Sequence, residues 1–205
     1  MRIFIQARMG STRFPGKVLL GDPPILGHLV KRLKKCVRSS GVTVVTTTET
    51  EDDALALYCN DHKIRVVRFG GDPMDVAGRF IFAAGDMEAV VRICADSPFV
   101  YPGTVDKAIY LWQHQRPERP SAVGREGSTP LVTNIPNSGN SVEVVNIRTL
   151  KELHPHMTTE EKEHVTLALY SLPGVMRFKS PYGGITVDYP EDLQKYEDRL
   201  LEDVV

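Results

Sequence analysis

Short apolar runs rich in β-branched residues alternate with amphipathic stretches along the first half of the chain. Residues 2–7 form the first apolar run. In residues 25–37 the apolar positions recur at helical spacing, at Ile25, Leu26, Leu29, Val30 and Leu33. The alternation continues with a strand over 42–48, a helix over 51–61, a strand over 64–69, a helix near 75–84, a strand over 89–94 and a helix over 104–115. This order predicts an α/β fold, a mostly parallel sheet with helices on both faces.

The regular pattern stops in the second half of the chain and then resumes. Prolines, glycines, serines and asparagines interrupt residues 116–141, which predicts an irregular arm. We then expect a strand over 142–145, a helix over 158–172 opened by a Thr158-x-x-Glu161 capping box, a strand pair near 176–179 and 185–187, and a terminal helix from Pro190. With 205 residues and 41% hydrophobic content, the chain can bury one core. We expect a single domain over 1–205, with 116–165 as an arm region within it.

Charge is distributed unevenly along a nearly neutral chain. The formal net charge is −1, yet residues 1–38 hold nine Lys and Arg against one acid, Asp22. The expected attraction for an anion is therefore local, and no nucleic-acid partner is predicted. The three cysteines lack the spacing of a disulfide framework or a zinc ribbon, which favours a cytoplasmic location. No apolar run approaches the roughly 20 residues needed to cross a bilayer, so no membrane association is expected.

A cationic, glycine-containing loop follows the first predicted strand. It reads Gln-Ala-Arg-Met-Gly-Ser-Thr-Arg-Phe-Pro-Gly-Lys over residues 6–17. Gly10 and Gly16 let the backbone turn and approach a polyphosphate closely, while Arg8, Arg13 and Lys17 supply positive charge. The loop is not a P-loop, because Val18 follows the Gly-Lys pair. The residues predict a phosphate-binding loop, with a merely solvated basic loop as the alternative.

Two aspartates directly follow predicted strands. Asp96 comes after the run 90–94 and Asp188 after the run 185–187, and ligands of such sheets bind beyond the carboxyl ends of the strands. A carboxylate in that position can hold a divalent cation against phosphate oxygens. Each also has a structural alternative. Asp188-x-x-Glu191 with Pro190 could be a helix N-terminus, and Asp96-Ser97-Pro98 could be a turn closed by the Asp side chain.

These motifs together resemble a known family, the sugar-acid cytidylyltransferases, particularly its spore-coat polysaccharide branch related to the acylneuraminate and 3-deoxy-manno-octulosonate cytidylyltransferases. The family loop Gln-Ala-Arg-x-Gly-Ser-x-Arg-x-Pro-x-Lys is matched at every fixed position of residues 6–17. The family segments Arg-Ile-x-x-Asp-x-Pro and Val-Asp-x-Pro-Glu-Asp-Leu are matched by residues 92–98 and 187–193. The resemblance extends over essentially the whole chain and implies a Rossmann-like, GT-A-like nucleotidyltransferase domain.

The resemblance also implies an activity and a set of site residues. The activity is transfer of CMP from CTP to an acidic sugar or a related small acceptor, with release of pyrophosphate, by a homodimer that uses Mg²⁺. The implied catalytic residues are Arg8, Arg13 and Lys17. The implied nucleotide contacts are Gln6, Ala7, Arg8, Met9, Gly10, Ser11, Arg13, Lys17, Thr47, Thr48, Arg92 and Ala95. The implied metal ligands are Asp96 and Asp188. The implied contacts to the acceptor and to the dimer partner are Glu143, Glu163 and His164, within the region 116–165.

Two departures from the family pattern keep alternatives open. Gly78 and Ser141 stand where relatives usually carry aspartate, so the acceptor could be unusual or the transfer activity weakened. One alternative is a non-catalytic CTP-binding relative. The other is a GT-A-type glycosyltransferase that uses a nucleotide-sugar donor, although no Asp-x-Asp metal motif occurs near a strand end.

Overall fold

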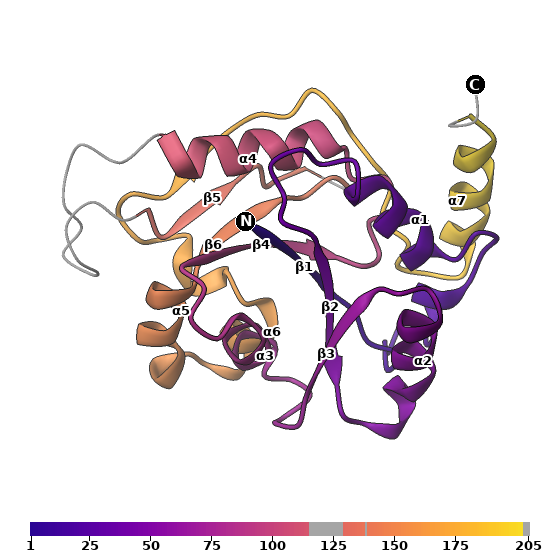
Figure 1. Ribbon diagram of the computed structural model, residues 1–205, viewed down its shortest axis with the longest axis horizontal. Coiled ribbons are helices and arrows are strands. Elements are labelled where there is room, and N and C mark those ends of the chain that lie inside the picture. The colour runs from indigo at the N-terminus through magenta and orange to yellow at the C-terminus, as the bar shows by residue number, and fades with distance from the viewer. Residues whose placement is uncertain (115–128, 138, 203–205) are drawn as a thin grey trace.

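The computed structural model describes residues 1–114, 129–137 and 139–202, and its described strands form one mixed sheet (Figure 1). The strands are β1 (Arg2–Gln6), β2 (Val42–Thr47), β3 (Arg65–Phe69), β4 (Ala89–Cys94), β5 (Leu131–Thr133), β6 (Glu143–Asn146) and β7 (Met176–Arg177). Their order across the sheet is β3-β2-β1-β4-β6-β5-β7. β6 runs antiparallel to both of its neighbours, and the other pairs are parallel. The mostly parallel α/β sheet predicted from the alternating pattern is confirmed.

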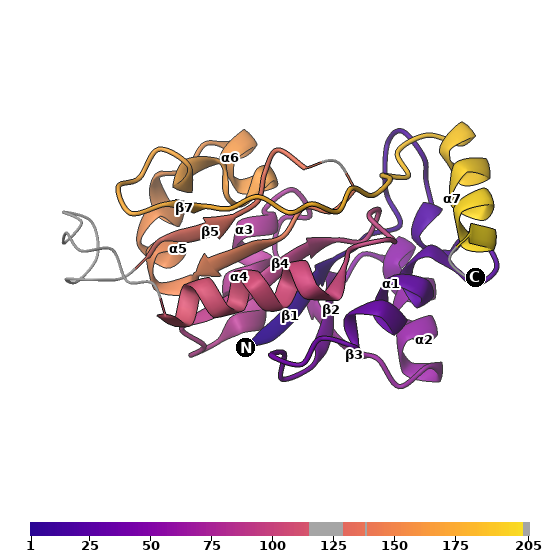
Figure 2. The ribbon, with the colours of Figure 1, turned by 90° about the horizontal axis from the view of Figure 1, so that it is seen from above.

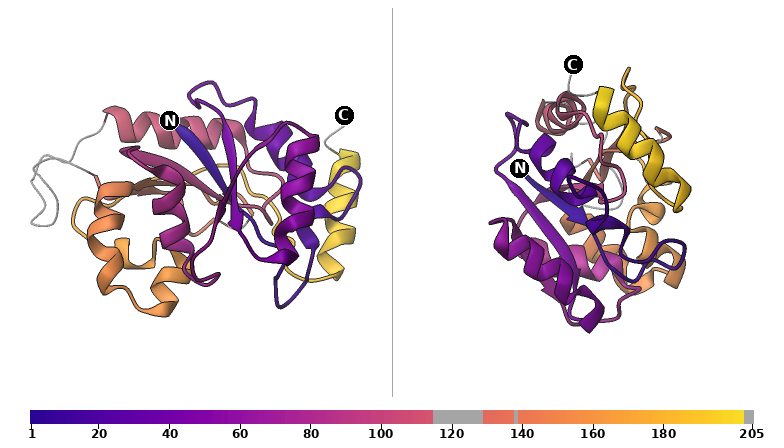
Figure 3. Two further views of the ribbon diagram at one scale, coloured as in Figure 1. Left: turned by 60° about the horizontal axis from the view of Figure 1, so that its bottom comes forward. Right: turned by 90° about the vertical axis from the view of Figure 1, so that its right-hand side faces the viewer.

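Helices cover both faces of this sheet (Figures 1 and 2). The first face carries α1 (Ile25–Leu33), α2 (Asp53–Asp61) and α4 (Pro102–His114). The second face carries α3 (Val76–Ala84), α5 (Ile147–Leu153) and α6 (Thr159–His164). The terminal helix α7 (Glu191–Glu202) lies beside α1 at one end of the molecule (Figure 3). Among the described helices, none is long and apolar enough to span a membrane.

The alternation of side chains along β1 assigns each residue to one face. Ile3 and Ile5 are buried in the core under α1, whereas Phe4 is buried against α3 on the second face. A third, smaller cluster joins α7 to the body of the molecule through Tyr196, which is fully buried and donates its hydroxyl hydrogen to the carbonyl oxygen of Pro23 at 2.5 Å. The terminal helix is thereby packed against the segment that leads into α1.

The second half of the chain departs from the sequence-based expectation. Residues 131–133 of the predicted irregular arm form the buried strand β5, and helix α5 was not predicted. The helix predicted over 158–172 ends at His164, because Val165 adopts a φ of 58°, which no α-helix accommodates. The Thr158–Glu161 capping box is confirmed. Residues 185–187 do not form a strand, and β7 pairs with β5 instead. Residues 116–128 and 138 of the predicted arm, and residue 115 at the end of the helix predicted over 104–115, lie outside the described part.

Candidate active site

The predicted phosphate-binding loop, residues 6–17, forms a compact turn beyond the end of β1. Hydrogen bonds within its own backbone close this turn. The carbonyl oxygen of Met9 accepts hydrogen bonds from the N–H groups of Ser11 and Gly16, both at 2.9 Å. Gly16 has a φ of 72°, a left-handed conformation that favours glycine. The short helix η1 (Lys17–Leu19) begins directly after it, so this turn fixes where Lys17 enters the site.

A buried carboxylate attaches the loop to the end of β2. Asp52, at the end of η2 (Thr50–Asp52), is 2% exposed, and its Oδ1 accepts the N–H of Met9 at 2.7 Å. Its Oδ2 accepts from the hydroxyls of Thr46 and Thr47 and from the N–H of Thr47. Burial raises the pKa of Asp52, but these hydrogen bonds outweigh it and hold the pKa below its ordinary value. Asp52 therefore stays ionised and holds the loop against the sheet.

The two predicted metal ligands converge on the loop lysine. The ammonium of Lys17 lies 3.2 Å from Oδ2 of Asp96 and 3.1 Å from Oδ1 of Asp188. The Lys17 side chain is only 7% exposed, whereas both carboxylates are about one quarter exposed. The backbone N–H of Val187 donates to the carbonyl oxygen of Asp96 at 2.8 Å, which ties the two aspartate segments together. The structure therefore brings together three predicted site residues that lie far apart in the sequence.

This arrangement fits a divalent cation. A single ammonium lies between the carboxylates of Asp96 and Asp188, which shows that both oxygens face one position that a cation can occupy. Mg²⁺ is commonly held by one or two carboxylates together with phosphate oxygens, so a two-carboxylate set is sufficient when a nucleotide supplies the rest. No cluster of three or more His, Cys, Asp or Glu side chains with metal-binding geometry occurs within the described ranges.

Arg13 completes the cationic side of this group. Its Nη2 lies 2.9 Å from Oδ1 of Asp188, and its guanidinium carbon lies 5.5 Å from the ring centroid of Tyr189. Tyr189 and then Asp188 raise the pKa of Arg13 above its ordinary value. Asp192, in the first turn of α7, accepts with its Oδ2 the N–H groups of Asp188 and Tyr189, both at 3.0 Å, and so ties the segment before the helix to its start. The Asp188 carboxylate itself accepts from Arg13 and Lys17 and faces these cations.

A polar cleft of about 310 Å³ opens beside this group. That volume is at the lower end of the range typical of small-molecule sites. Its described lining residues are Gln6, Ala7, Arg8, Ser11, Thr12, Arg13, Lys17, Val18, Cys94, Ala95, Asp96 and Glu163. The lining combines the loop, the end of β4 and one residue of α6, so most of the predicted nucleotide contacts share one cavity.

Arg8 is directed to a different side of the cleft from the other two predicted catalytic cations. Its Nη1 lies 3.3 Å from the sulfur of Met74, and its Nη2 lies 3.9 Å from Oε1 of Glu163 on α6. Lys17 and Arg13 instead face Asp188. The cleft thus has two sides. On the phosphate side, Lys17 and Arg13 pair with a carboxylate. On the α6 side, Arg8 and Glu163 border the cleft.

Two predicted contact residues lie beneath the cleft rather than in it. Arg92 Nη1 and Glu143 Oε2 form an ion pair at 2.5 Å, and Glu143 is 1% exposed. Glu143 also accepts hydrogen bonds from Thr166 Oγ1 at 3.0 Å and from the hydroxyl of Tyr170. All of its described partners are internal, and neither Glu143 nor Arg92 is among the described residues that line the cleft, so their contacts with an acceptor and a nucleotide stay predictions.

The remaining predicted contacts also differ in position. The hydroxyl of Thr47 donates a hydrogen bond to Asp52, and Thr48 is exposed beyond the end of β2. Neither is among the described residues that line the cleft. His164 is exposed at the end of α6 and is likewise absent from that lining. Asp52, which anchors the loop, was not predicted from the sequence, although a signal was present: three threonines at a strand end precede an acidic helix start.

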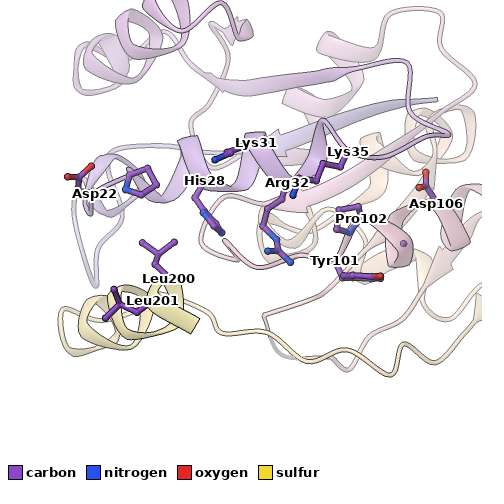
Figure 4. Close-up of a pocket in the computed structure, with 12 residues that line it drawn as sticks. Asp22, His28, Lys31, Arg32, Lys35, Tyr101, Pro102, Asp106, Leu200 and Leu201 are labelled. Atoms are coloured by element: carbon purple, nitrogen blue, oxygen red, sulfur yellow. The ribbon is translucent and has the colours of Figure 1, made fainter. Parts of the chain in front are cut away.

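A second cavity, of about 780 Å³, lies away from the loop (Figure 4). Figure 4 shows His28 and Arg32 extending from α1 toward a space that Leu200 and Leu201 border from α7. None of the described residues that line it belongs to the predicted site. We therefore place the chemistry in the smaller cleft, where the predicted cations and carboxylates converge.

Comparison with known proteins gives consistent results in sequence and in structure. A family model described as "Cytidylyltransferase" matches residues 3–199. The chain is 31% identical over 209 residues to the spore coat polysaccharide biosynthesis protein SpsF of Bacillus subtilis, a match that covers 93% of this chain and 82% of that protein. It is 33% identical over 114 residues to a 3-deoxy-manno-octulosonate cytidylyltransferase of Anaeromyxobacter sp., covering 52% of this chain and 45% of that relative.

Among solved structures, a cytidylyltransferase from Leptospira borgpetersenii superposes with a TM-score of 0.83 at 26% identity. The match covers 98% of this chain and 86% of the other. This likeness confirms the expected nucleotidyltransferase fold.

Proposed function

The chain belongs to the cytidylyltransferase family, and we propose that it transfers CMP from CTP to an acidic sugar, with release of pyrophosphate, in the synthesis of a surface polysaccharide or other glycoconjugate. The observation that carries the proposal is the convergence of Lys17, Asp96 and Asp188 at one edge of the sheet, next to the loop. A polyphosphate needs both backbone N–H groups and side-chain cations there, and the loop offers both.

The reaction requires no nucleophile from the protein. An oxygen of the acceptor would attack the α-phosphorus of CTP in line, and the bond to pyrophosphate would break. Arg13 and Lys17 would stabilise the negative charge that builds on the departing pyrophosphate, because the Asp188 carboxylate holds both cations beside the loop. Asp96 and Asp188 would hold Mg²⁺, which when bound supplies Lewis-acid polarisation of a phosphate oxygen.

Pyrophosphate release is the direct test. The protein with magnesium is offered CTP, UTP, GTP or ATP against a panel of acidic sugars that includes 3-deoxy-manno-octulosonate, together with small phosphorylated and hydroxylated acids. We expect release from CTP with one acid and little release from the other nucleotides. Equal use of all four nucleotides would contradict the cytidylyl assignment, and tight CTP binding without turnover would favour the non-catalytic alternative.

The two departures from the family pattern have local structural accounts. The N–H of Gly78 donates to Oδ1 of Asp75 at the start of α3, and a Cβ at position 78 would lie only 2.3 Å from Oδ2 of Asp75. Ser141 Oγ donates to the carbonyl oxygen of Asn137 at 2.7 Å. Neither residue lines the described cleft, so neither favours the non-catalytic alternative.

A homodimer and a cytoplasmic location belong to the same proposal. The dimer rests on the family resemblance, with the region 116–165 as the expected contact. Light scattering at micromolar concentration should give about twice the 22.9 kDa chain mass, and a monomer there would count against it. The three cysteines are free thiols, as is usual in a reducing cytoplasm.

A further inference from the structure

The side chain of Gln6, the last residue of β1, lies on the second face of the sheet. Side chains of β1 alternate, so Gln6 shares the second face with Phe4, which is buried against α3. Val18, next to Lys17, is buried in the core of the first face. Gln6 nevertheless lines the cleft, together with Arg8 and Glu163. Its side chain therefore meets a ligand from the α6 side rather than from the phosphate side.

The orientation of the Gln6 amide is fixed by its neighbour. Arg92 Nε donates a hydrogen bond to Oε1 of Gln6 at 3.2 Å. A guanidinium can only donate, so the amide must present its oxygen to Arg92 and turn its NH₂ group away. Arg92 is itself held by the buried Glu143, which also accepts from Thr166 and Tyr170. A chain of internal contacts thus fixes the orientation of the Gln6 side-chain amide.

The NH₂ group of Gln6 is available to a ligand. Within the part of the chain that the structure describes, this nitrogen forms no hydrogen bond, and it is not among the buried polar atoms that lack a partner. It is therefore reached from the cleft. Beside it, Arg8 offers further N–H donors, and Glu163 offers an acceptor.

We propose that Gln6 is a specificity-determining residue that donates a hydrogen bond to the carboxylate of the acceptor sugar, on the α6 side of the cleft. The proposal deepens the proposed function and rests on it. An amide N–H and a guanidinium suit a carboxylate, while Glu163 can accept from a sugar hydroxyl, so the α6 side matches a hydroxy acid. Gln6, grouped by sequence with the nucleotide contacts, is thereby reassigned to the acceptor.

Gln6→Glu is the informative variant, because it keeps an oxygen for Arg92 and replaces the donor in the cleft with a second oxygen. CMP transfer is measured with the acid identified by the nucleotide panel, varying acid and CTP separately. We expect KM for the acid to rise about tenfold or more and KM for CTP to stay within about twofold. Gln113→Glu, the same change at an exposed position of α4, should alter neither constant.

Tyr170→Phe tests the internal chain of contacts. It removes one donor from Glu143 without touching the cleft, so KM for the acid should rise about two- to tenfold while KM for CTP stays unchanged. If Tyr170 were needed only for folding, Tyr170→Phe would lower the thermal stability and leave KM for the acid and KM for CTP unchanged. A rise in KM for CTP, with either variant, would assign Gln6 to the nucleotide and overturn the proposal.

A binding measurement separates failure of this proposal from failure of the proposed function. In protein labelled with ¹⁵N-glutamine, the Gln6 side-chain resonance is identified by its loss in Gln6→Glu. CTP is added first without magnesium, followed by 3-deoxy-manno-octulosonate or the acid from the panel. We expect the resonance to shift on addition of the acid. A shift with CTP alone, or no shift with either compound, would overturn the role of Gln6, whereas absence of turnover bears on the proposed function.

Discussion

Lys17 is a buried cation whose two described partners are both carboxylates of the proposed metal site. Lys17→Ala should lower turnover about 100-fold or more, because a positioned charge on the leaving group is lost. The melting temperature should change by only a few degrees, since the two carboxylates that lose their partner are about one quarter exposed and can be hydrated. Lys31→Ala, on the exposed face of α1, is the matched control. Turnover at the wild-type rate in Lys17→Ala would remove this residue from the mechanism.

Asp52 gives a prediction for the pH dependence of stability. Its pKa is lowered in the folded protein, so the unfolded chain takes up the proton first and the stabilisation is lost as the pH falls below about 4. Asp52→Asn should cost about 2 kcal/mol at neutral pH. The difference in melting temperature from wild type should shrink in acid. For Asp61→Asn, exposed at the end of α2, the difference in melting temperature from wild type should not shrink in acid. A difference for Asp52→Asn that does not depend on pH would contradict the lowered pKa of Asp52.

At the level of single residues, the sequence indicated which charged side chains form the site better than it indicated which way each side chain points. The loop cations, Asp96 and Asp188 converge as expected. The loop and Asp96 follow neighbouring parallel strands, and the backbone of Val187 bonds to Asp96 and brings Asp188 to the same edge, although 185–187 is not a strand. Glu143 was placed at the acceptor, but its strand position turns it toward Arg92 inside the protein. Whether a charged residue of a strand faces a ligand or a buried partner depends on a neighbouring strand, which local sequence does not reveal.

At the scale of elements, the capping box gives a stability prediction for α6. Thr158 Oγ1 accepts the N–H of Glu161 at 3.2 Å, and Glu161 Oε2 accepts the N–H of Thr158 at 2.7 Å. Thr158→Ala should destabilise the protein by about 1 kcal/mol, lowering the melting temperature by about 2–4 °C. Thr159→Ala, one residue later and exposed, should leave it nearly unchanged. Equal effects of the two changes would show that the cap contributes nothing.

The elements of the first half were predictable because each apolar run is long and bounded by turns. The later elements were not, for reasons visible in the structure. β5 has only three residues, Leu131–Thr133, too few to show a period, and it depends on pairing with β6 and β7. The end of α6 depends on the left-handed backbone of Val165, a conformation that a β-branched residue rarely adopts. Tertiary contacts, rather than local propensity, set these two boundaries.

At the scale of the whole molecule, Tyr196 connects α7 to the rest of the fold. It is fully buried in the cluster with Ile25, Phe99 and Val187, the residue that precedes Asp188. Tyr196→Phe should cost about 1 kcal/mol through the lost bond to Pro23, and Tyr196→Ala about 3–5 kcal/mol. Tyr196→Ala should also raise KM for CTP, because α7 holds Asp188 in place.

Denaturant titration and steady-state kinetics check these expectations, with Tyr110→Phe on the exposed side of α4 as the control. Unchanged KM for CTP in a folded Tyr196→Ala protein would show that α7 does not position the site.

The contact between Arg13 and Asp188 joins residues 175 positions apart. The loop and Asp96 lie within the first 96 residues, whereas Asp188 is added 92 residues after Asp96. Because a ribosome adds residues from the N-terminus onward, a nascent chain carries the phosphate loop long before it carries the second carboxylate. With Asp188 in its proposed role, catalytic competence requires that synthesis has passed residue 188, so a chain stalled between Asp96 and Asp188 should not consume CTP.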